Sequence, residues 1–173
     1  MDENIIMIDE NDNEIGSGNK MHIHKEGILH RAFSIFIFNS QGQMLIQKRS
    51  RNKYHSGGLW TNTCCSHPRI GENIAVSTHR RLKEEMGFDC ELKRTFCFTY
   101  FADLDNGFIE NELDHVFVGF YDGELKPNVL EVEDWKWVSP EGVKIDIKQN
   151  PDCYSHWFKL VAERAIDISY NKK

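Results

Sequence analysis

The pattern of apolar and polar positions predicts a β-hairpin early in the chain. Residues 32–38 are mostly aromatic and β-branched, residues 39–42 carry turn-forming side chains, and residues 44–49 begin with a second apolar run. Similar side chains predict three further strands, near residues 91–101, 109–121 and 132–138. We therefore expect the core to be built around a β-sheet.

Three segments are predicted to be helices beside that sheet. Residues 72–86 precede Gly87, a residue type that often ends a helix in the left-handed conformation. Residues 154–168 carry apolar side chains at helical spacing, namely Trp157, Leu160, Val161 and Ala165. A short helix is expected near residues 141–147. A sheet flanked by helices corresponds to an α/β or α+β fold.

Length and composition fit one domain. The chain has 173 residues, of which 40% are apolar, and this is enough to bury a sizeable core. No Ser/Gly-rich linker, low-complexity block or internal repeat divides the sequence, so we predict a single domain over residues 1–173. Residues 1–19 are expected to form either a capping strand or a loose arm.

Charge and cysteine content narrow the expected partners and compartment. The formal net charge is −6, which gives no reason to expect binding to nucleic acid or to an anionic membrane surface. The five cysteines are an odd number and include no CxxC pair, which favours a reducing compartment. The sequence starts without the basic segment of a secretory signal and contains no apolar run of membrane-spanning length. We expect a cytoplasmic protein of unknown oligomeric state.

The helix predicted over residues 72–86 is densely charged. Arg80 and Glu84, like Arg81 and Glu85, stand four positions apart and can pair, which alone indicates a solvated helix face. Glu72 lies eight positions before Arg80, however, and this wider spacing resembles the signature of the Nudix superfamily. In that family a loop and helix of the form G-x5-E-x7-R-E-U-x-E-E-x-G-U, with U apolar, hold divalent cations against a diphosphate.

The match runs from Ser66 to Phe88 and departs from the family pattern at two positions. Ser66 stands at the place of the first glycine, and Arg81 at the place of the glutamate that follows the arginine. The second change replaces a carboxylate of the hydrolytic metal cluster with a cation. We expect this charge inversion to weaken metal-assisted attack of water on a diphosphate, so a reaction other than hydrolysis is indicated.

Three other segments, residues 29–34, 60–68 and 110–112, closely resemble the type I isopentenyl-diphosphate isomerases of the Nudix superfamily. The similarity extends from about Lys20 to Trp157. The resemblance implies a Nudix-like fold, a mixed central β-sheet flanked by helices. It also implies a small prenyl diphosphate as the substrate, interconverted between isopentenyl and dimethylallyl diphosphate by proton addition and removal at carbon.

The pair Glu110 and Glu112 is a candidate for binding a cation. On a strand the two side chains point to the same face and can converge on one ion. The simpler interpretation is an edge strand that carries solubilising charge. The isomerase resemblance favours the cation site, because it adds three histidines at the family's metal-binding positions, namely His24, His30 and His67.

Three imidazole nitrogens and two or more carboxylate oxygens suit an octahedral ion, and Mn2+, Mg2+ and Zn2+ all remain open. The other histidines are assigned to packing or to the surface, namely His22, His55, His79, His115 and His156. His22 and His24 alternate if this segment is a strand, so either could reach the ion. His24 keeps the family's spacing after Lys20.

The same resemblance implies the catalytic residues. Cys65 takes the position of the catalytic thiol, and Glu112 is the carboxyl expected across the substrate from it. Tyr100 is expected to hydrogen-bond Glu112, and Trp157 to place its π face against a cationic intermediate. Without the resemblance, buried cysteines such as Cys64 act as small apolar residues and a tryptophan on an amphipathic helix is a core anchor.

The diphosphate end of the substrate needs cations. By resemblance, these are Lys20, Arg49, Lys53 and Arg81, with Ser66 as a further hydrogen-bond donor. A second ion, Mg2+, is expected to bridge the diphosphate to Glu85. Arg81, which spoils a hydrolytic cluster, would then place positive charge near the phosphates.

Two alternatives stay open from the sequence. A Nudix diphosphate hydrolase would release phosphate and would be indifferent to Cys65→Ala. A metal-stabilised binding module would bind ions without turnover.

Overall fold

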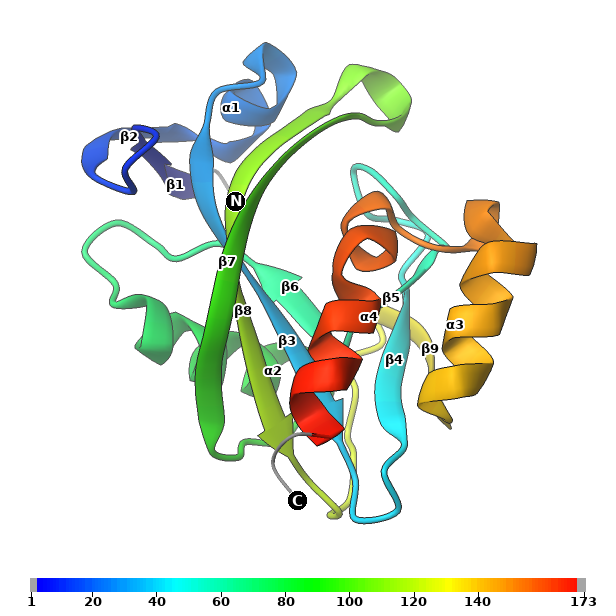
Figure 1. The fold of residues 1–173 in the computed structure, drawn as a ribbon. Helices are drawn as coiled ribbons and strands as arrows, with labels where there is room; N and C mark the ends of the chain where they lie inside the picture. Colours follow the sequence, from blue (N-terminus) through cyan, green and yellow to red (C-terminus); the bar gives the residue numbers. More distant parts are fainter. Residues whose placement is uncertain (1–2, 171–173) are drawn as a thin grey trace.

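The computed structural model describes residues 3–170, so Met1 and Asp2 of the predicted arm lie outside it. Its strands are β1 (Asn4–Ile8), β2 (Glu14–Asn19), β3 (His30–Phe38), β4 (Met44–Arg49), β5 (Trp60–Thr61), β6 (Cys64–Ser66), β7 (Leu92–Asp103), β8 (Ile109–Phe120) and β9 (Val132–Val138). Its helices are α1 (Lys20–Glu26), α2 (Ile74–Met86), α3 (Pro140–Gln149) and α4 (His156–Tyr170), with short 3₁₀ turns η1 (Asp105–Gly107) and η2 (Pro151–Cys153). The expected fold, a mixed sheet flanked by helices, is confirmed (Figure 1).

Strand β3 organises the sheet. It pairs antiparallel with β1, β4 and β6 and parallel with β8, and the parallel ladder runs from His30 opposite Glu112 to Phe38 opposite Phe120. Strand β7 continues the sheet beyond β8, and β9 continues it beyond β4. Strand β8 therefore has a partner on each side, so the interpretation of Glu110 and Glu112 as charges on an edge strand is wrong.

The side chains of β3 alternate between two apolar layers, which is why the strand is almost continuously apolar. Phe33 and Ile35 pack with Leu82 of α2, whereas Phe36 packs on the opposite face with Phe158 of α4. Figure 1 shows α4, in red, beside the central strands. Each fully buried side chain of this size contributes roughly 1.5–3 kcal/mol.

Both long helices lie close to their predicted ranges. Helix α2 begins after Asn73, whose side chain accepts a hydrogen bond from the Ala75 amide, and ends at Gly87 with φ of 76°. A side chain at Gly87 would also collide with the backbone of Lys126, which reinforces the need for glycine. On α4 the buried positions do not include Leu160, which is 52% exposed.

The N-terminal segment differs from the prediction. Strands β1 and β2 form a hairpin that joins the sheet through β3, so the described part of the predicted arm is not loose. Residues 20–26 form helix α1 rather than a strand. Because helical side chains turn by about 100° per residue, positions two apart point away from each other: His22 is exposed and His24 is completely buried.

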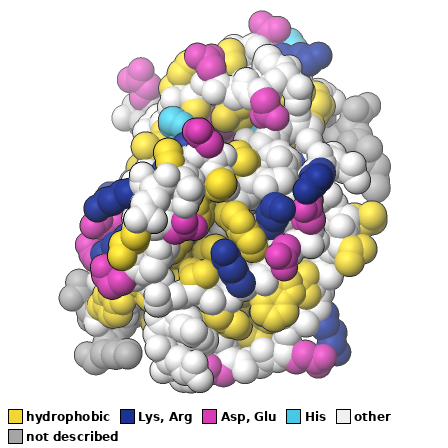
Figure 2. All heavy atoms as spheres, turned by 90° about the vertical axis from the view of Figure 1, so that its right-hand side faces the viewer, with side chains coloured by type: hydrophobic (Ala, Val, Ile, Leu, Met, Phe, Trp, Pro, Cys, Tyr) yellow, Lys and Arg dark blue, Asp and Glu magenta, His cyan; other side chains and the backbone are white. Residues whose placement is uncertain are grey.

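The face of the molecule seen in Figure 2 carries no large patch of like-charged side chains. There, basic, acidic and apolar side chains are interspersed. Among residues 3–170, no helix combines the length and apolar character needed to cross a membrane.

Candidate active site and metal centre

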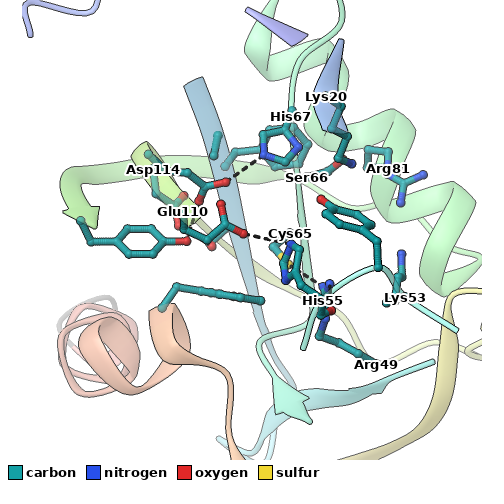
Figure 3. Close-up of a pocket in the computed structure, with 17 residues that line it drawn as sticks. Lys20, Arg49, Lys53, His55, Cys65, Ser66, His67, Arg81, Glu110 and Asp114 are labelled. Atoms are coloured by element: carbon teal, nitrogen blue, oxygen red, sulfur yellow. Dashed lines mark hydrogen bonds and ion pairs between the residues drawn. The ribbon is translucent and has the colours of Figure 1, made fainter. Parts of the chain in front are cut away.

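A cavity opens where β3, β6 and β8 meet the loop formed by residues 50–59. The residues that line it come from distant parts of the chain, namely Lys20, Ala32, Phe33, Ser34, Arg49, Lys53, Tyr54, His55, Cys65, Ser66, His67, Arg81, Tyr100, Glu110, Glu112, Asp114 and Trp157. Figure 3 shows acidic side chains, Glu110 and Asp114, on one side and basic ones, Lys53, Arg49 and Arg81, on the other. The cavity thus has an acidic part and a basic part.

Five buried side chains gather at the acidic part: His24, His30, His67, Glu110 and Glu112. Each offers one ligand atom, and these atoms all lie within 4.8 Å of one another. The fold explains the gathering, because the parallel register places His30 directly opposite Glu112, and α1 supplies His24. His67 follows β6, which is the other neighbour of β3 in this region.

Hydrogen bonds orient two of the imidazoles toward this centre. The Nδ1–H group of His24 donates to the Lys20 carbonyl at 2.7 Å, and that of His30 donates to the Ile28 carbonyl at 2.8 Å. Their Nε2 atoms face carboxylates, at 3.4 Å from Glu110 Oε2 and 3.3 Å from Glu112 Oε1. Both Nε2 atoms and Glu110 Oε2 are buried without a hydrogen-bond partner. Such a set of lone pairs fits a divalent cation, as does the outer hydrogen bonding of the histidines.

The protonation states of Glu110, Glu112 and His67 also suit a cation. Burial acts to lower the pKa of His30, but its contacts with Glu112 outweigh this effect and raise that pKa. Burial raises the pKa of Glu110, but its contacts with His24 and His55 outweigh this effect and hold that pKa well below its usual value. For Glu112, burial and the Glu110 charge act upward, and the contacts with His30 and His67 bring the pKa below its usual value. Both carboxylates are therefore ionised at neutral pH. Burial lowers the pKa of His67 well below its usual value, which favours its neutral, ligating form.

His55 belongs to this region although the sequence analysis assigned it to packing or the surface. Its Nε2 atom lies 3.1 Å from Glu110 Oε1, and its side chain is 3% exposed. It comes from the loop of residues 50–59, which carries no strand or helix periodicity. No pattern in the sequence could have placed it beside Glu110.

Asp114 was missed as well, and here a signal was available. It continues the alternation of Glu110 and Glu112 along β8, and it is buried in the cavity wall. Ser34 Oγ donates a hydrogen bond to Asp114 Oδ2 at 2.7 Å. Burial, together with the charge of Glu112, raises the pKa of Asp114 well above its usual value.

The two adjacent cysteines have different surroundings. Cys64 is fully buried in the apolar layer under α2, whereas Cys65 lines the cavity. Alternation along β6 produces this difference. Burial raises the pKa of the Cys65 thiol to about 12, partly offset by Arg49, whose Nη1 atom lies 3.7 Å from the sulfur. The thiol is protonated at neutral pH.

Tyr100 and Trp157 both lie at this cavity. The Tyr100 hydroxyl donates to Glu112 Oε2 at 2.6 Å, as expected from the resemblance. Trp157 stands at the start of α4, and its indole N–H donates to Asn62 Oδ1 at 3.1 Å. The Arg49 guanidinium lies 5.2 Å from the centre of the Trp157 ring, so this ring already faces a cation.

The expected diphosphate-binding residues Lys20, Arg49, Lys53, Ser66 and Arg81 all line the cavity. The Nε atoms of Arg49 and Arg81 are buried without a hydrogen-bond partner, which leaves charged donors for an anion. Burial acts to lower the pKa of Arg81, but the charge of Glu85 outweighs this effect and raises the pKa above its usual value. Arg81 therefore remains a cation.

Three expected site residues, His24, His30 and Glu85, are not among those that line the cavity. The two histidines belong to the buried ligand cluster, whereas Glu85 does not. It is bound by Arg81 and accepts a hydrogen bond from Gln47 Nε2 at 2.9 Å. Arg80, the arginine of the Nudix pattern, pairs with Glu72 instead: its Nε and Nη2 atoms each donate a hydrogen bond to the Glu72 carboxylate at 2.7 Å. The Glu72–Arg80 spacing therefore serves to hold the loop before α2 onto the helix.

Comparisons with known proteins agree with this geometry. The NUDIX domain family model matches residues 28–158. Isopentenyl-diphosphate Delta-isomerase 2 of Photorhabdus laumondii is 53% identical, over 93% of this chain and 91% of the relative. Isopentenyl-diphosphate Delta-isomerase 1 of Aromatoleum aromaticum is 52% identical, over 96% of this chain and 94% of the relative.

Among solved structures, DR0079 from Deinococcus radiodurans has a TM-score of 0.79, with 17% identity over 94% of this chain and 99% of that one. At this identity the likeness concerns the fold alone. Together with the sequence relatives, it leads to one conclusion: the chain belongs to the NUDIX domain family and, within it, to the isopentenyl-diphosphate Delta-isomerases.

Proposed function

We propose that this protein interconverts isopentenyl diphosphate and dimethylallyl diphosphate. A proton is added to one end of the double bond, and another is removed from the carbon on the far side. The observation that carries the proposal is the arrangement of one cavity, in which Cys65 and the Tyr100-bound Glu112 lie beside a cluster of metal-ligating side chains and a basic part.

The reaction needs a dry site, because an alkene is a weak base and water would capture the tertiary cation that forms. Glu112 and Trp157 are buried, at 6% and 3% exposure. The Trp157 ring would stabilise the cationic intermediate, by roughly 2 kcal/mol where water is excluded. Tyr100 would hold Glu112 in position through its hydroxyl.

Cys65 and Glu112 would act as the two proton-transfer groups. In the ligand-free protein Cys65 holds a proton, because burial raises its pKa, whereas Glu112 is ionised. One group carries a proton and the other can accept one, as a proton shift between two carbons requires. Because the reaction is reversible, each group must donate in one direction and accept in the other.

His24, His30, His67, Glu110 and Glu112 would hold a divalent cation, which we propose to be Mn2+, Mg2+ or Zn2+. Such an ion supplies positive charge beside Glu112 and so couples the acidity of this carboxyl to the metal centre. Lys20, Arg49, Lys53, Ser66 and Arg81 would bind the diphosphate. A Mg2+ ion carried with the diphosphate would be held by Glu85, and this requires that Glu85 give up its ion pair with Arg81.

The test is to incubate the purified protein with isopentenyl diphosphate and Mg2+ and to follow the products by proton and phosphorus NMR. We expect the allylic isomer and no free phosphate, because Arg81 replaces a carboxylate of the hydrolytic pattern. Release of phosphate without the isomer would favour a Nudix hydrolase instead, and tight ion binding without any product would favour a binding module.

A further inference from the structure

The carboxylate of Glu131 stands between two of the cations that line the cavity. It forms an ion pair with Lys53, and its Oε1 atom lies 3.5 Å from Arg81 Nη2. Lys53 and Arg81 both line the cavity, whereas Glu131 is not among the lining residues. The charges of these cations lower the pKa of Glu131 despite its burial, so it is an anion. Glu131 therefore pairs with two cations that line the cavity, although it does not line the cavity itself.

Backbone hydrogen bonds hold the main chain at Glu131 in place. The Glu131 amide donates to the Asn128 carbonyl at 2.9 Å, and the Ser50 amide donates to the Glu131 carbonyl at 3.0 Å. The Asn128 amide in turn donates to the carbonyl of Glu85 on α2, at 2.8 Å. Glu131 is thus tied to the end of β4 and to α2, the elements that carry or precede Lys53 and Arg81. Its position beside the two cations is a feature of the fold.

We infer that Glu131 is an internal counter-anion of the diphosphate-binding region, and that it competes with the ligand's phosphates for Lys53 and Arg81. The inference rests on the proposed function, which places the diphosphate at these two cations. A diphosphate that reaches the cavity meets cations whose charge is already partly neutralised, and it is repelled by the carboxylate paired with them. Glu131 therefore weakens diphosphate binding.

Weak binding at this end suits the reaction. Substrate and product carry the same diphosphate, so any affinity for it stabilises the ground states as much as the transition state and does not accelerate the chemical step. A diphosphate held too tightly would slow product release instead. By lowering affinity at the end that does not change, Glu131 favours turnover.

The chain contains a matched control two positions away. Glu133 also pairs with two cations, at 3.0 Å from Lys48 Nζ and 3.1 Å from Arg51 Nε. Its side-chain exposure, 29%, is close to the 25% of Glu131. None of the three residues in this second cluster lines the cavity. Replacing Glu133 removes an equal charge and a similar pair of contacts away from the ligand.

The experiment measures binding of inorganic diphosphate in the presence of Mg2+ by titration calorimetry, at low and high salt. The proteins are the wild type, Glu131→Gln, Glu131→Ala and Glu133→Gln, each checked for folding by circular dichroism and thermal melting. At low salt we expect both Glu131 variants to bind about three- to tenfold more tightly, with the gain shrinking at high salt. Glu133→Gln should stay within about twofold of the wild type, because neither Glu133 nor the two cations it pairs with line the cavity.

Turnover gives a second readout. With isopentenyl diphosphate as substrate, Glu131→Gln should lower KM and leave kcat unchanged or reduced. Unchanged or weaker diphosphate binding in both Glu131 variants, or an equal gain in Glu133→Gln, would overturn the inference. The binding arm needs no chemistry, so a wild type that binds diphosphate but forms no allylic isomer would contradict the proposed function alone.

Discussion

One face of β8 carries two different chemistries along its length. Glu110, Glu112 and Asp114 face the cavity at one end, and Val116 and Val118 enter the apolar layer under α4 at the other. Strand β3 follows the same division, from His30 opposite Glu112 to Phe38 opposite Phe120. A single ladder of backbone hydrogen bonds therefore supports both an ionisable cluster and a hydrophobic core.

The two ends contribute to stability in opposite directions. Burying carboxylates costs several kcal/mol per ion unless they are paired and hydrogen-bonded. Glu110 and Glu112 obtain that pairing from four histidines, whereas the apolar end gains free energy directly from burial. The polar end thus contributes little to the stability of the fold and supplies the ionisable groups, whereas the apolar end stabilises the two strands that carry them. Changes at the polar end should mainly affect activity and metal binding, and changes at the apolar end should mainly affect folding.

The largest effect is expected from the two neighbouring cysteines. Cys65→Ala removes a proton-transfer group and should lower the rate of isomer formation at least about a thousandfold, within the range of general acid–base catalysis. Cys64→Ala trims the core and should retain most activity, with a lower melting temperature. Rates measured on both variants, with circular dichroism as the folding check, test the contrast; equal loss of activity in the two would contradict it.

At the apolar end, Phe36→Ala should lower the free energy of unfolding by about 3–5 kcal/mol, because it removes a fully buried ring between β3 and α4. Denaturant titration measures this change. The folded fraction should keep its metal affinity, since Phe36 does not belong to the ligand cluster. Loss of metal binding in the folded variant would mean that the two ends are not separable in this way.

A pH-dependent effect is expected on the opposite face of β8, at His115. Burial and the nearby Arg94 lower its pKa to about 4, so the folded protein keeps this side chain neutral while the unfolded chain protonates it near pH 6.5. Stability from this group is therefore complete above pH 6.5 and is lost as the pH falls toward 4. The loss amounts to up to about 3 kcal/mol. His115→Gln should flatten this part of the stability profile, and an unchanged slope would contradict the assignment.

The effect of metal removal should depend on an intact ligand cluster at the polar end. Chelation should destabilise the wild type by about 2.7 kcal/mol relative to protein with the ion at one hundred times its Kd. His30→Asn removes a central ligand, so its melting temperature should respond little to chelator or to added Mn2+, Mg2+ or Zn2+. Thermal melts with and without each ion provide the measurement, and an equal response in both proteins would place the ion elsewhere.

The smallest effect is expected at His55, which holds the oxygen of Glu110 that faces away from His24. His55→Ala should weaken metal binding about 10- to 100-fold, in the range found for residues that position metal ligands. His55→Gln keeps a hydrogen-bond donor and should recover part of the affinity. Calorimetry with the preferred ion measures both variants, and failure of either to differ from the wild type would remove His55 from this role.

Much of the fold could be predicted because its signals are local. The apolar runs of β3 and β4 and the glycine that ends α2 are visible in the sequence, and the predicted ranges lie within a few residues of the observed ones. Helix α1 was missed because its seven residues give a weak period, and this placed His24 on a strand. Strand β1 carries a run of four apolar residues, whereas β2 offers only Ile15, so a loose arm remained an open alternative.

The site was harder to predict because it depends on pairing between distant strands. The residue types pointed to a cation site, but nothing in the sequence gives the register that sets His30 opposite Glu112. The resemblance supplied that grouping instead. Asp114 could have been found by extending the alternation of Glu110 and Glu112 by one step, whereas His55 depends on the path of an irregular loop.

The central claim is that Cys65 and Glu112 move protons at carbon in one shared cavity. Its most direct test is the incorporation of deuterium into isopentenyl diphosphate in heavy water, followed by NMR in the wild type, Cys65→Ala and Glu112→Gln, all confirmed to be folded. The wild type should place deuterium in both isomers, and each variant should place almost none. Exchange at the wild-type rate in both variants would contradict the account.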